Sequence, residues 1–274
     1  MHKHVIRVCI GLTLAVTLVL ISAMGKEALA RSADEDKGWH FSVAPYLWLP
    51  ALDGDITVRG RTAPVDLSIG DFTELVFENF RLAAIGHVEA RRDRWILLTD
   101  VLYLSLKADE DTPLMTQTEI DYTQLILEFG GGYRLGTWPV GEEGPTTLTA
   151  DVLAGGRYVY MDTELEIRGS GPLGASVKVA KDVDWLDPFV GLRLWFAFTD
   201  TFTVTLRGDV GGFDVGSDFT WNAVGTFQFH LSEKFTLVAG YRALDIEYDQ
   251  GRDRTRFVYD VQLRGPVLGV NIHF

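Results

Sequence analysis

Apolar and polar residues alternate along almost the whole chain beyond its N-terminal region, and this period of two limits the fold more than any other feature. In the segment 201–210, TFTVTLRGDV, the apolar residues Phe202, Val204 and Leu206 share one parity. Threonine, arginine and aspartate fill the alternate positions. Successive side chains of a β-strand point to opposite faces, whereas an amphipathic helix repeats every 3.6 residues. The sequence therefore predicts an all-β protein.

Alternation by itself fits two architectures. A soluble sandwich turns its apolar face toward a core, whereas a membrane barrel turns that face toward lipid and keeps its polar face in the lumen. The segments 116–134, 146–161 and 234–249 exceed the usual length of globular strands and suit tilted membrane spans. Aromatic residues gather near strand ends, as in interfacial girdles, and charged residues stand in mid-strand. These features favour a transmembrane barrel.

The pattern predicts about ten strands in an antiparallel, up-and-down transmembrane β-barrel with both termini in the periplasm. The predicted strands are 39–50, 80–91, 95–109, 116–134, 146–161, 187–198, 202–213, 218–231, 234–249 and 256–274. The connections 92–94, 136–146, 199–201 and 232–234 fall on the periplasmic side. The connections 51–79, 110–115, 162–186, 214–217 and 250–255 fall outside the cell, and 51–79 and 162–186 are the long ones. Both long connections also alternate, so we expect hairpins that extend beyond the lipid. Merging of strands would give eight, and a further membrane crossing would give twelve.

The N-terminus has the pattern of a cleaved secretory signal peptide over residues 1–30. Lys3 and Arg7 precede an apolar run over 8–23, and Ala28 and Ala30 have the spacing of a cleavage site. The apolar run falls short of the roughly 20 residues that a spanning helix needs. We expect a short leader over 31–38 and the barrel over 39–274. The single cysteine lies in the signal peptide, so the barrel is expected to fold without a disulfide.

Five segments carry the most specific pattern in the chain. They are WHFSVAPYLWLPALDGDITVRG (39–60), DPFVGLRLW (187–195), RGDVGGFDVGSDFTWN (207–222), AGYRALDIEYDQG (239–251) and GPVLGVNIHF (265–274). Together they resemble a family of uncharacterised Gram-negative outer-membrane β-barrel proteins that are often labelled porin-like. The resemblance covers 39–274, implies location in the cell outer membrane, and assigns no chemistry.

The resemblance also implies a role for the last segment. Its alternate residues Leu268, Val270, Ile272 and Phe274 look like the barrel-insertion signal that the barrel assembly machinery reads in outer-membrane proteins. The partners expected are this machinery during insertion and the lipid and lipopolysaccharide of the outer membrane. The net charge of −13 argues against a nucleic-acid partner, which would require clustered Lys and Arg. The oligomeric state stays open.

If the apolar residues face lipid, the alternate polar set faces the lumen. The sequence predicts a lumen charge network of both signs, formed by Arg81, His87, Glu89, Arg91, Asp100, Glu128, Arg134, Asp151, Arg157, Arg193, Arg207, Asp209, His230, Arg242, Asp260 and Arg264. The two signs nearly balance in this set although the chain is strongly acidic. The acidic excess is therefore expected in the loops.

This lumen favours one function over two others. About ten strands enclose a narrow interior, because eight are just filled by side chains and water-filled porins have 16–18. Paired charges there predict a polar plug and a structural or interaction role with acidic extracellular loops. The alternative is a narrow porin-like channel for small solutes, anions included.

An outer-membrane enzyme is the third reading. His87 with Glu89 and Asp100, or His230 with Asp209, has the residue types of a base and its orienting acid. The spacing fixes no nucleophile, so no catalytic residue is predicted. No metal site or cofactor is predicted either, because the acidic stretches 107–112 and 245–254 lack the spacing of a calcium loop.

Overall fold

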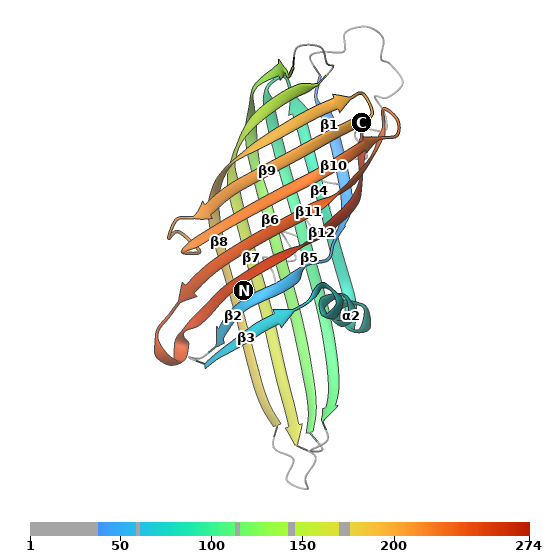
Figure 1. Cartoon of the computed structure of the whole chain (residues 1–274). Helices are drawn as coiled ribbons and strands as arrows, with labels where there is room; N and C mark the ends of the chain where they lie inside the picture. The colour runs from blue at the N-terminus through green and yellow to red at the C-terminus, as the bar shows by residue number, and fades with distance from the viewer. Residues whose placement is uncertain (1–37, 59–60, 113–115, 142–145, 170–175) are drawn as a thin grey trace.

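Ten antiparallel strands close into a barrel in the computed structural model, which describes residues 38–58, 61–112, 116–141, 146–169 and 176–274 (Figure 1). The strands are β1 (His40–Trp48), β4 (Phe80–Arg92), β5 (Trp95–Thr112), β6 (Thr116–Pro139), β7 (Thr147–Gly169), β8 (Ser176–Thr199), β9 (Phe202–Gly212), β10 (Phe219–His230), β11 (Phe235–Gln250) and β12 (Phe257–His273). Pairing of β1 with β12 closes the ring. The prediction of an all-β barrel of about ten strands is confirmed. The predicted signal peptide 1–30 and all but the last residue of the leader 31–38 lie outside the described residues.

The first predicted strand, 39–50, corresponds to β1, and the chain continues beyond Pro50 as the expected hairpin. β12 pairs with β1 through Val267–His273 and with β2 (Ala51–Val58) through Phe257–Arg264. Proline has no backbone N–H to donate, so the ladder is interrupted there, and the amide of Leu49 bonds the carbonyl of Pro266 at 3.2 Å. β3 (Arg61–Leu67) pairs back onto β2, which makes the hairpin an extension of the barrel wall.

A helix occupies the end of the long connection 51–79, where sequence alternation led us to expect only a hairpin. α2 (Ile69–Asn79) follows β3 and lies beside it in Figure 1. Ser68 and Asp71 cap its start, since the Asp71 amide bonds Ser68 Oγ at 3.2 Å and the Ser68 amide bonds Asp71 Oδ2 at 3.0 Å. Among the described residues, no helix has the length and apolar character to span a membrane.

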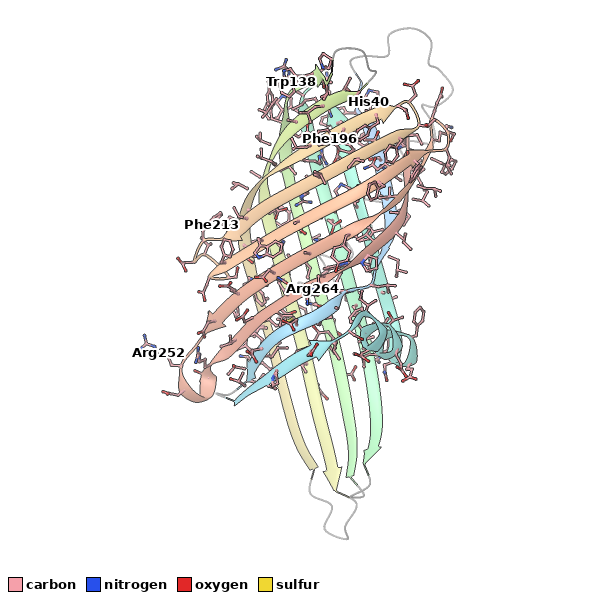
Figure 2. All side chains as sticks on the ribbon, in the orientation of Figure 1. His40, Trp138, Phe196, Phe213, Arg252 and Arg264 are labelled. Atoms are coloured by element: carbon pink, nitrogen blue, oxygen red, sulfur yellow. The ribbon has the colours of Figure 1, made fainter. Side chains whose placement is uncertain are left out.

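Four neighbouring strands project far beyond the rest of the barrel. β5, β6, β7 and β8 continue past the ends of β9–β12 at the lower end of Figure 1. Most of the predicted loop 162–186 is therefore strand, and belongs to the hairpin of β7 and β8. The opposite end carries the tight turns that follow β4, β8 and β10, and His40 and Trp138 mark it in Figure 2, where Arg252 lies at the other end. By the asymmetry typical of such barrels, the end with the short turns is periplasmic.

The outer wall changes polarity along its strands. On β11 the exposed side chains of Phe235, Leu237 and Tyr241 point outward in the periplasmic half. The same parity further along carries Asp245 and Glu247. Apolar outward residues match lipid, and polar outward residues match water. The membrane belt therefore ends between Tyr241 and Asp245, and the rest of β11 stands in the extracellular medium.

The polarity of the barrel interior reverses at the same level along the strands. Periplasmic to it, the lumen is polar; beyond it, buried apolar side chains fill the barrel. This extracellular core comprises Trp48, Leu102, Ile126, Val159, Met161, Val183, Trp185, Leu244, Ile246, Tyr248, Phe257, Tyr259, Val261, Leu263 and Val267. Trp185 stacks on Tyr248 with ring centroids 4.1 Å apart. The extracellular part of the barrel is thus built like a water-soluble protein, with its apolar side inside.

Candidate functional site

The lumen at membrane level is crossed by a buried network of arginines and carboxylates, and Glu128 on β6 is its centre. Arg157 Nε on β7 lies 3.1 Å from Glu128 Oε1, and Arg242 Nη2 on β11 lies 2.9 Å from the same oxygen. Arg207 Nη2 on β9 donates to Glu128 Oε2 at 2.7 Å. One carboxylate therefore joins three other strands of the barrel wall through charge-assisted hydrogen bonds.

Arg242 spans the lumen from β11. Its Nη1 donates to Asp100 Oδ1 on β5 and to the hydroxyl of Tyr46 on β1, both at 3.0 Å. Its Nε donates to Asn222 Oδ1 on β10 at 3.0 Å. The guanidinium also lies 5.0 Å from the ring centroid of Trp48, where the network meets the extracellular core. The Nε, Nη1 and Nη2 atoms of Arg242 therefore each donate to a partner, as a buried charge requires.

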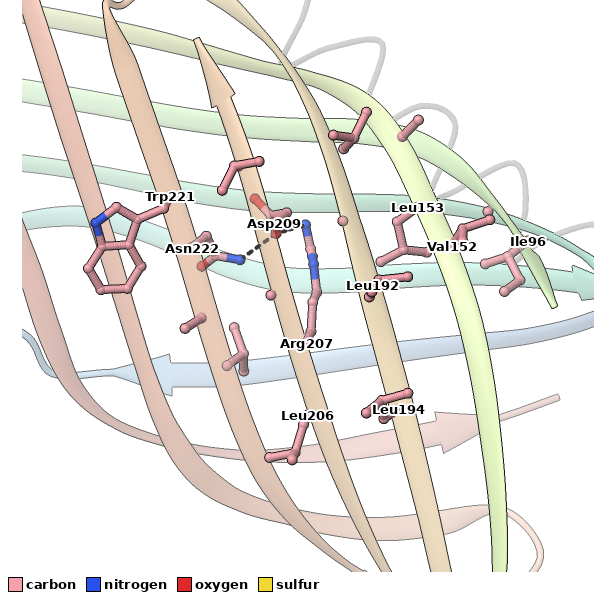
Figure 3. Close-up of a pocket in the computed structure, with 18 of the residues that line it drawn as sticks. Ile96, Val152, Leu153, Leu192, Leu194, Leu206, Arg207, Asp209, Trp221 and Asn222 are labelled. Atoms are coloured by element: carbon pink, nitrogen blue, oxygen red, sulfur yellow. Dashed lines mark hydrogen bonds and ion pairs between the residues drawn. The ribbon is translucent and has the colours of Figure 1, made fainter. Parts of the chain in front are cut away.

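Asp209 on β9 completes this layer of the network. It accepts from Arg157 Nη2 at 2.6 Å and from Asn222 Nδ2 at 2.8 Å, and Arg207 Nη2 lies 2.9 Å from it. Figure 3 shows the Asn222, Asp209 and Arg207 side chains joined across β9 and β10. Arg157 and Asp209 are both buried, so neither charge is left without an opposite partner.

A second layer lies nearer the periplasmic end and links β4, β7 and β8. Arg193 Nη1 donates to Glu89 Oε2 at 2.5 Å, and Arg193 Nη2 donates to Asp151 Oδ2 at 3.0 Å. Trp195 Nε1 donates to the same Asp151 oxygen at 2.9 Å. Two guanidinium groups contact the Trp195 ring, with the Cζ atoms of Arg91 and Arg193 at 4.5 and 4.7 Å from its centroid.

His87 connects the two layers. Its Nε2 lies 3.5 Å from Glu89 Oε2, and its Nδ1 lies 3.5 Å from Asp100 Oδ2. No hydroxyl or thiol among the described residues is hydrogen-bonded to His87. The other predicted pair, His230 with Asp209, does not form. His230 instead bonds the hydroxyls of Thr203 and Thr236 at 3.0 and 2.9 Å, in the opposite, periplasmic end of the lumen.

The structure brings most of the predicted lumen residues into these two layers. The members that form an ion pair there are His87, Glu89, Arg91, Asp100, Glu128, Arg134, Asp151, Arg157, Arg193, Arg207, Asp209 and Arg242. His230 faces the same lumen without an ion pair among the described residues.

Three predicted lumen residues lie outside, and the prediction is corrected for them. Asp260 and Arg264 are exposed on the outer wall of β12, because the parity that faces lipid near the C-terminus continues outward into the extracellular medium. Arg81 is displaced by an irregular pairing between Phe80 and Leu82, and its exposed side chain pairs with Asp121 on the outer wall. The error arose from equating polar with inward, which fails above the membrane belt.

Asp187 on β8 belongs to the interior but was missed from the sequence. It is buried, accepts from Trp185 Nε1 at 3.0 Å, and accepts from the Ser217 amide at 2.6 Å. It is the first residue of the predicted strand 187–198, and it was not included in the predicted lumen set. Its parity with Arg193, three alternations later, was the signal that could have identified it.

A blind chamber opens at the periplasmic end. A mouth of about 580 Å³ lies between His40, Glu233 and Phe274, and leads to a chamber of about 310 Å³. Beyond the chamber, a pocket of about 160 Å³ reaches Tyr46, Asp100 and Arg242. The mouth, the chamber and this pocket together form a vestibule, and the layer of the network around Glu128 is its floor.

The chamber has a distinctive lining. It comprises His40, Phe41, Ser42, Arg91, Arg134, Thr149, Trp195, Ala197, Thr203, Gln228, His230, Asn271 and His273. Within the described part of the chain, this lining holds cationic and titratable basic side chains and no Asp or Glu.

The outer wall carries an apolar hollow of about 1470 Å³ at membrane level (Figure 3). Small residues that include Gly131, Ala154 and Gly208 form its floor, and Leu192 and Leu206 are among the larger side chains around them. These residues belong to the lipid-facing belt, so the hollow is a surface for hydrocarbon. Over the described residues, no group of three or more His, Cys, Asp or Glu side chains has the arrangement to hold a metal ion.

Comparisons with known proteins give similarity at the level of solved structures alone. No protein-family profile and no curated protein sequence matches the chain. The outer membrane protease OmpT from Escherichia coli is 8% identical, with a TM-score of 0.42 over 90% of this chain and 99% of that one. The attachment invasion locus protein Ail of Yersinia pestis, in a complex with sucrose octasulfate, is 12% identical, with a TM-score of 0.31 over 87% and 99%. Neisserial surface protein A is 12% identical, with a TM-score of 0.33 over 87% and 100%.

The class of the protein follows from its own geometry. A closed antiparallel wall leaves no unpaired strand edge at membrane level, its outer belt is apolar, and its lumen is polar. The protein is an outer-membrane β-barrel.

Proposed function

We propose that this protein is a non-conducting outer-membrane barrel with a structural or interaction role, sealed by its charge network. The observation that carries the proposal is the convergence of Arg157, Arg207 and Arg242 on Glu128 across the lumen. A solute would have to break several buried, charge-assisted bonds to pass, and each break would leave a charge unpaired in a low dielectric. The apolar extracellular core lies above this charged seal and closes the lumen a second time.

The surface available for interaction is the part that stands outside the membrane. The projecting strands β5–β8, the β2–β3 hairpin and α2 all lie beyond the belt. On α2 the side chain of Phe77 is strongly exposed, although single exposed apolar residues are common on protein surfaces. A rigid, plugged barrel is suited to hold such a surface at a fixed height above the lipid.

Lipopolysaccharide is the partner that the outer wall favours. Glu247, Asp260 and Asp55 lie directly opposite one another on β11, β12 and β2, just above the belt. Burial raises the pKa of Glu247, and the carboxylates of Asp245, Asp260 and Asp218 raise it further. Like charges placed opposite each other destabilise a sheet unless a cation intervenes. A divalent cation that bridges one carboxylate of this row to a lipopolysaccharide phosphate would supply that compensation, with the phosphate providing ligands that the described residues alone do not.

The barrel assembly machinery is the partner proposed during insertion. On β12 the side chains of Leu268, Val270 and Ile272 share the outward parity of the lipid belt, and Phe274 follows. An outward apolar row beside the seam with β1 suits recognition before the barrel closes.

Single-channel recording in planar bilayers tests the seal. The wild-type protein is expected to be silent, and Arg242→Ala or Glu128→Ala is expected to give intermittent conductance because the network then loses a bond that crosses the lumen. Arg264→Ala, on the outer wall, should remain silent. A steady conductance of the wild type would instead support a narrow channel and contradict the proposal.

A further inference from the structure

The network seals the lumen, but it does not explain the chamber on its periplasmic side. The chamber is larger than the pocket beneath it and is open to the periplasm through its mouth. Its volume of about 310 Å³ is at the lower end of the range for small-molecule sites, which is about 300–1,000 Å³.

The cationic side chains of the chamber are only partly used by the protein. Arg134 Nε donates to Asp151 Oδ1 at 3.2 Å, and Arg91 Nε donates to Glu89 Oε1. Across the described residues, each of these guanidinium groups bonds a carboxylate through Nε alone. Their side chains are 30% and 33% exposed, although the carboxylates they bond are buried. The terminal nitrogens of Arg91 and Arg134 are therefore left to bind something in the chamber.

The layer of the network at the chamber floor has more positive than negative side chains. Arg91, Arg134 and Arg193 surround Glu89 and Asp151, which leaves an excess of positive charge at the chamber floor. The layer beyond it is balanced, with Arg157, Arg207 and Arg242 against Glu128, Asp209 and Asp100. The layer at the chamber floor therefore has one arginine more than it has carboxylates, and this excess of positive charge lies on the periplasmic side of the network.

The remaining lining adds polar and apolar contacts. Buried in the wall, the Asn271 side-chain oxygen has no hydrogen-bond partner in the described structure. Asn271 therefore has an unused acceptor beside the chamber. Trp195, held by Asp151, and Phe41 supply flat apolar walls.

We propose that the chamber is a binding site for a small oxyanion, a carboxylate or phosphate compound that enters from the periplasm. The terminal nitrogens of Arg91 and Arg134 would bind its oxygens, and His230 and His273 would line its path. Guanidinium groups bind both oxyanions through paired N–H donors. This site goes beyond the proposed seal and interaction role, because a sealed barrel needs no ligand.

Isothermal titration of the detergent-folded barrel tests the site, with sodium benzoate and inorganic phosphate as separate probes. At least one probe is expected to bind the wild type, and the probe that binds identifies the carboxylate or the phosphate class. Arg134→Gln should weaken binding by about tenfold or more, because a charge-assisted contact is lost. Arg81→Gln is the matched control, since this exposed arginine also pairs with a carboxylate, and it should change affinity by less than about twofold.

A steric variant separates loss of binding from loss of folding. Ala197 lines the chamber, so Ala197→Phe fills it and leaves every arginine in place. It is expected to abolish binding while the heat-dependent gel shift of the folded barrel is kept. If Arg134→Gln does not fold, Ala197→Phe decides the question. Three results would each overturn the proposal. The first is that neither probe binds the wild type at 10 mM, a concentration on the order of the weakest useful affinity. The second is that Arg81→Gln weakens binding as much as Arg134→Gln does, and the third is that the folded Ala197→Phe variant binds like the wild type.

Discussion

Arg193 on β8 and Glu89 on β4 form an ion pair across the lumen, with Nη1 and Oε2 2.5 Å apart, although the two residues are 104 positions apart in the sequence. Both side chains are buried, and the same guanidinium bonds Asp151. The pair therefore connects opposite sides of the barrel and compensates two carboxylates at once. A buried charge deprived of its partner is strongly destabilising, even where the intact pair adds little.

Arg193→Ala is accordingly expected to lower the free energy of unfolding by about 3–5 kcal/mol, because Glu89 and Asp151 lose their shared partner. Urea unfolding in detergent micelles measures the change. Arg264→Ala, on the exposed outer wall, should stay within about 0.5 kcal/mol. Adding Glu89→Gln to Arg193→Ala should recover part of the loss, and the absence of any recovery would show that charge compensation is not the cause.

The sequence allowed prediction of the wall because each strand obeys a local rule. Period-two alternation persists through β9, β10 and β11, and the short turns are marked by charged and polar residues such as Asp200 and Glu233. The parity of Arg157, Arg193 and Arg207 was likewise readable, so their convergence in the lumen could be predicted. Which carboxylate each arginine bonds depends on strands far apart in the chain, and alternation carries no such information.

The errors come from the level at which the environment changes. Asp260 and Arg264 obey the same parity as Leu268, yet they stand in water because β12 leaves the lipid near Gly265. Alternation reports which residues share a face, but it does not report what lies against that face. Helix α2 was missed because its few turns were read as part of an alternating segment, although Ser68 and Asp71 have the spacing of a capping box.

The seam between β1, β2 and β12 is expected to tolerate no side chain at Gly265. A Cβ atom there would lie 2.0 Å from the carbonyl oxygen of Leu49, where the chain bends at Pro50. Gly265→Val should therefore destabilise the barrel by about 1–3 kcal/mol or prevent its closure. Gly208→Val is the control, because a Cβ on Gly208 would meet no atom within 4 Å. Heat-modified mobility in gels reports closure, and equal behaviour of the two variants would contradict this account of the seam.

The start of α2 is expected to respond to acid through Asp71. Hydrogen bonds from the side chain and backbone of Ser68 hold the Asp71 pKa below its ordinary value. Because the Asp71 pKa is lower in the folded state, the cap stabilises the helix fully when the pH is above the pKa of an unfolded Asp, about 4. This stabilisation is lost as the pH falls through the Asp71 pKa of the folded state. Carbon-13 shifts over 69–79 should lose helical character in this acidic range. Asp71→Asn should remove the pH dependence, and a wild-type helix that is unchanged by acid would count against the cap.

The level of the membrane is tested by arginine substitutions at two outward positions. Leu192 is 55% exposed on the outer wall of β8 within the belt, whereas Gln262 points outward from β12 beyond it. Leu192→Arg should cost about 2–4 kcal/mol in lipid, because a charge near the bilayer midplane loses its hydration. Gln262→Arg should change stability by less than about 0.5 kcal/mol, since it replaces one solvated side chain with another. Urea unfolding in phospholipid vesicles measures both free energies. Similar costs at the two positions would mean that the polarity change along the wall does not mark the edge of the lipid.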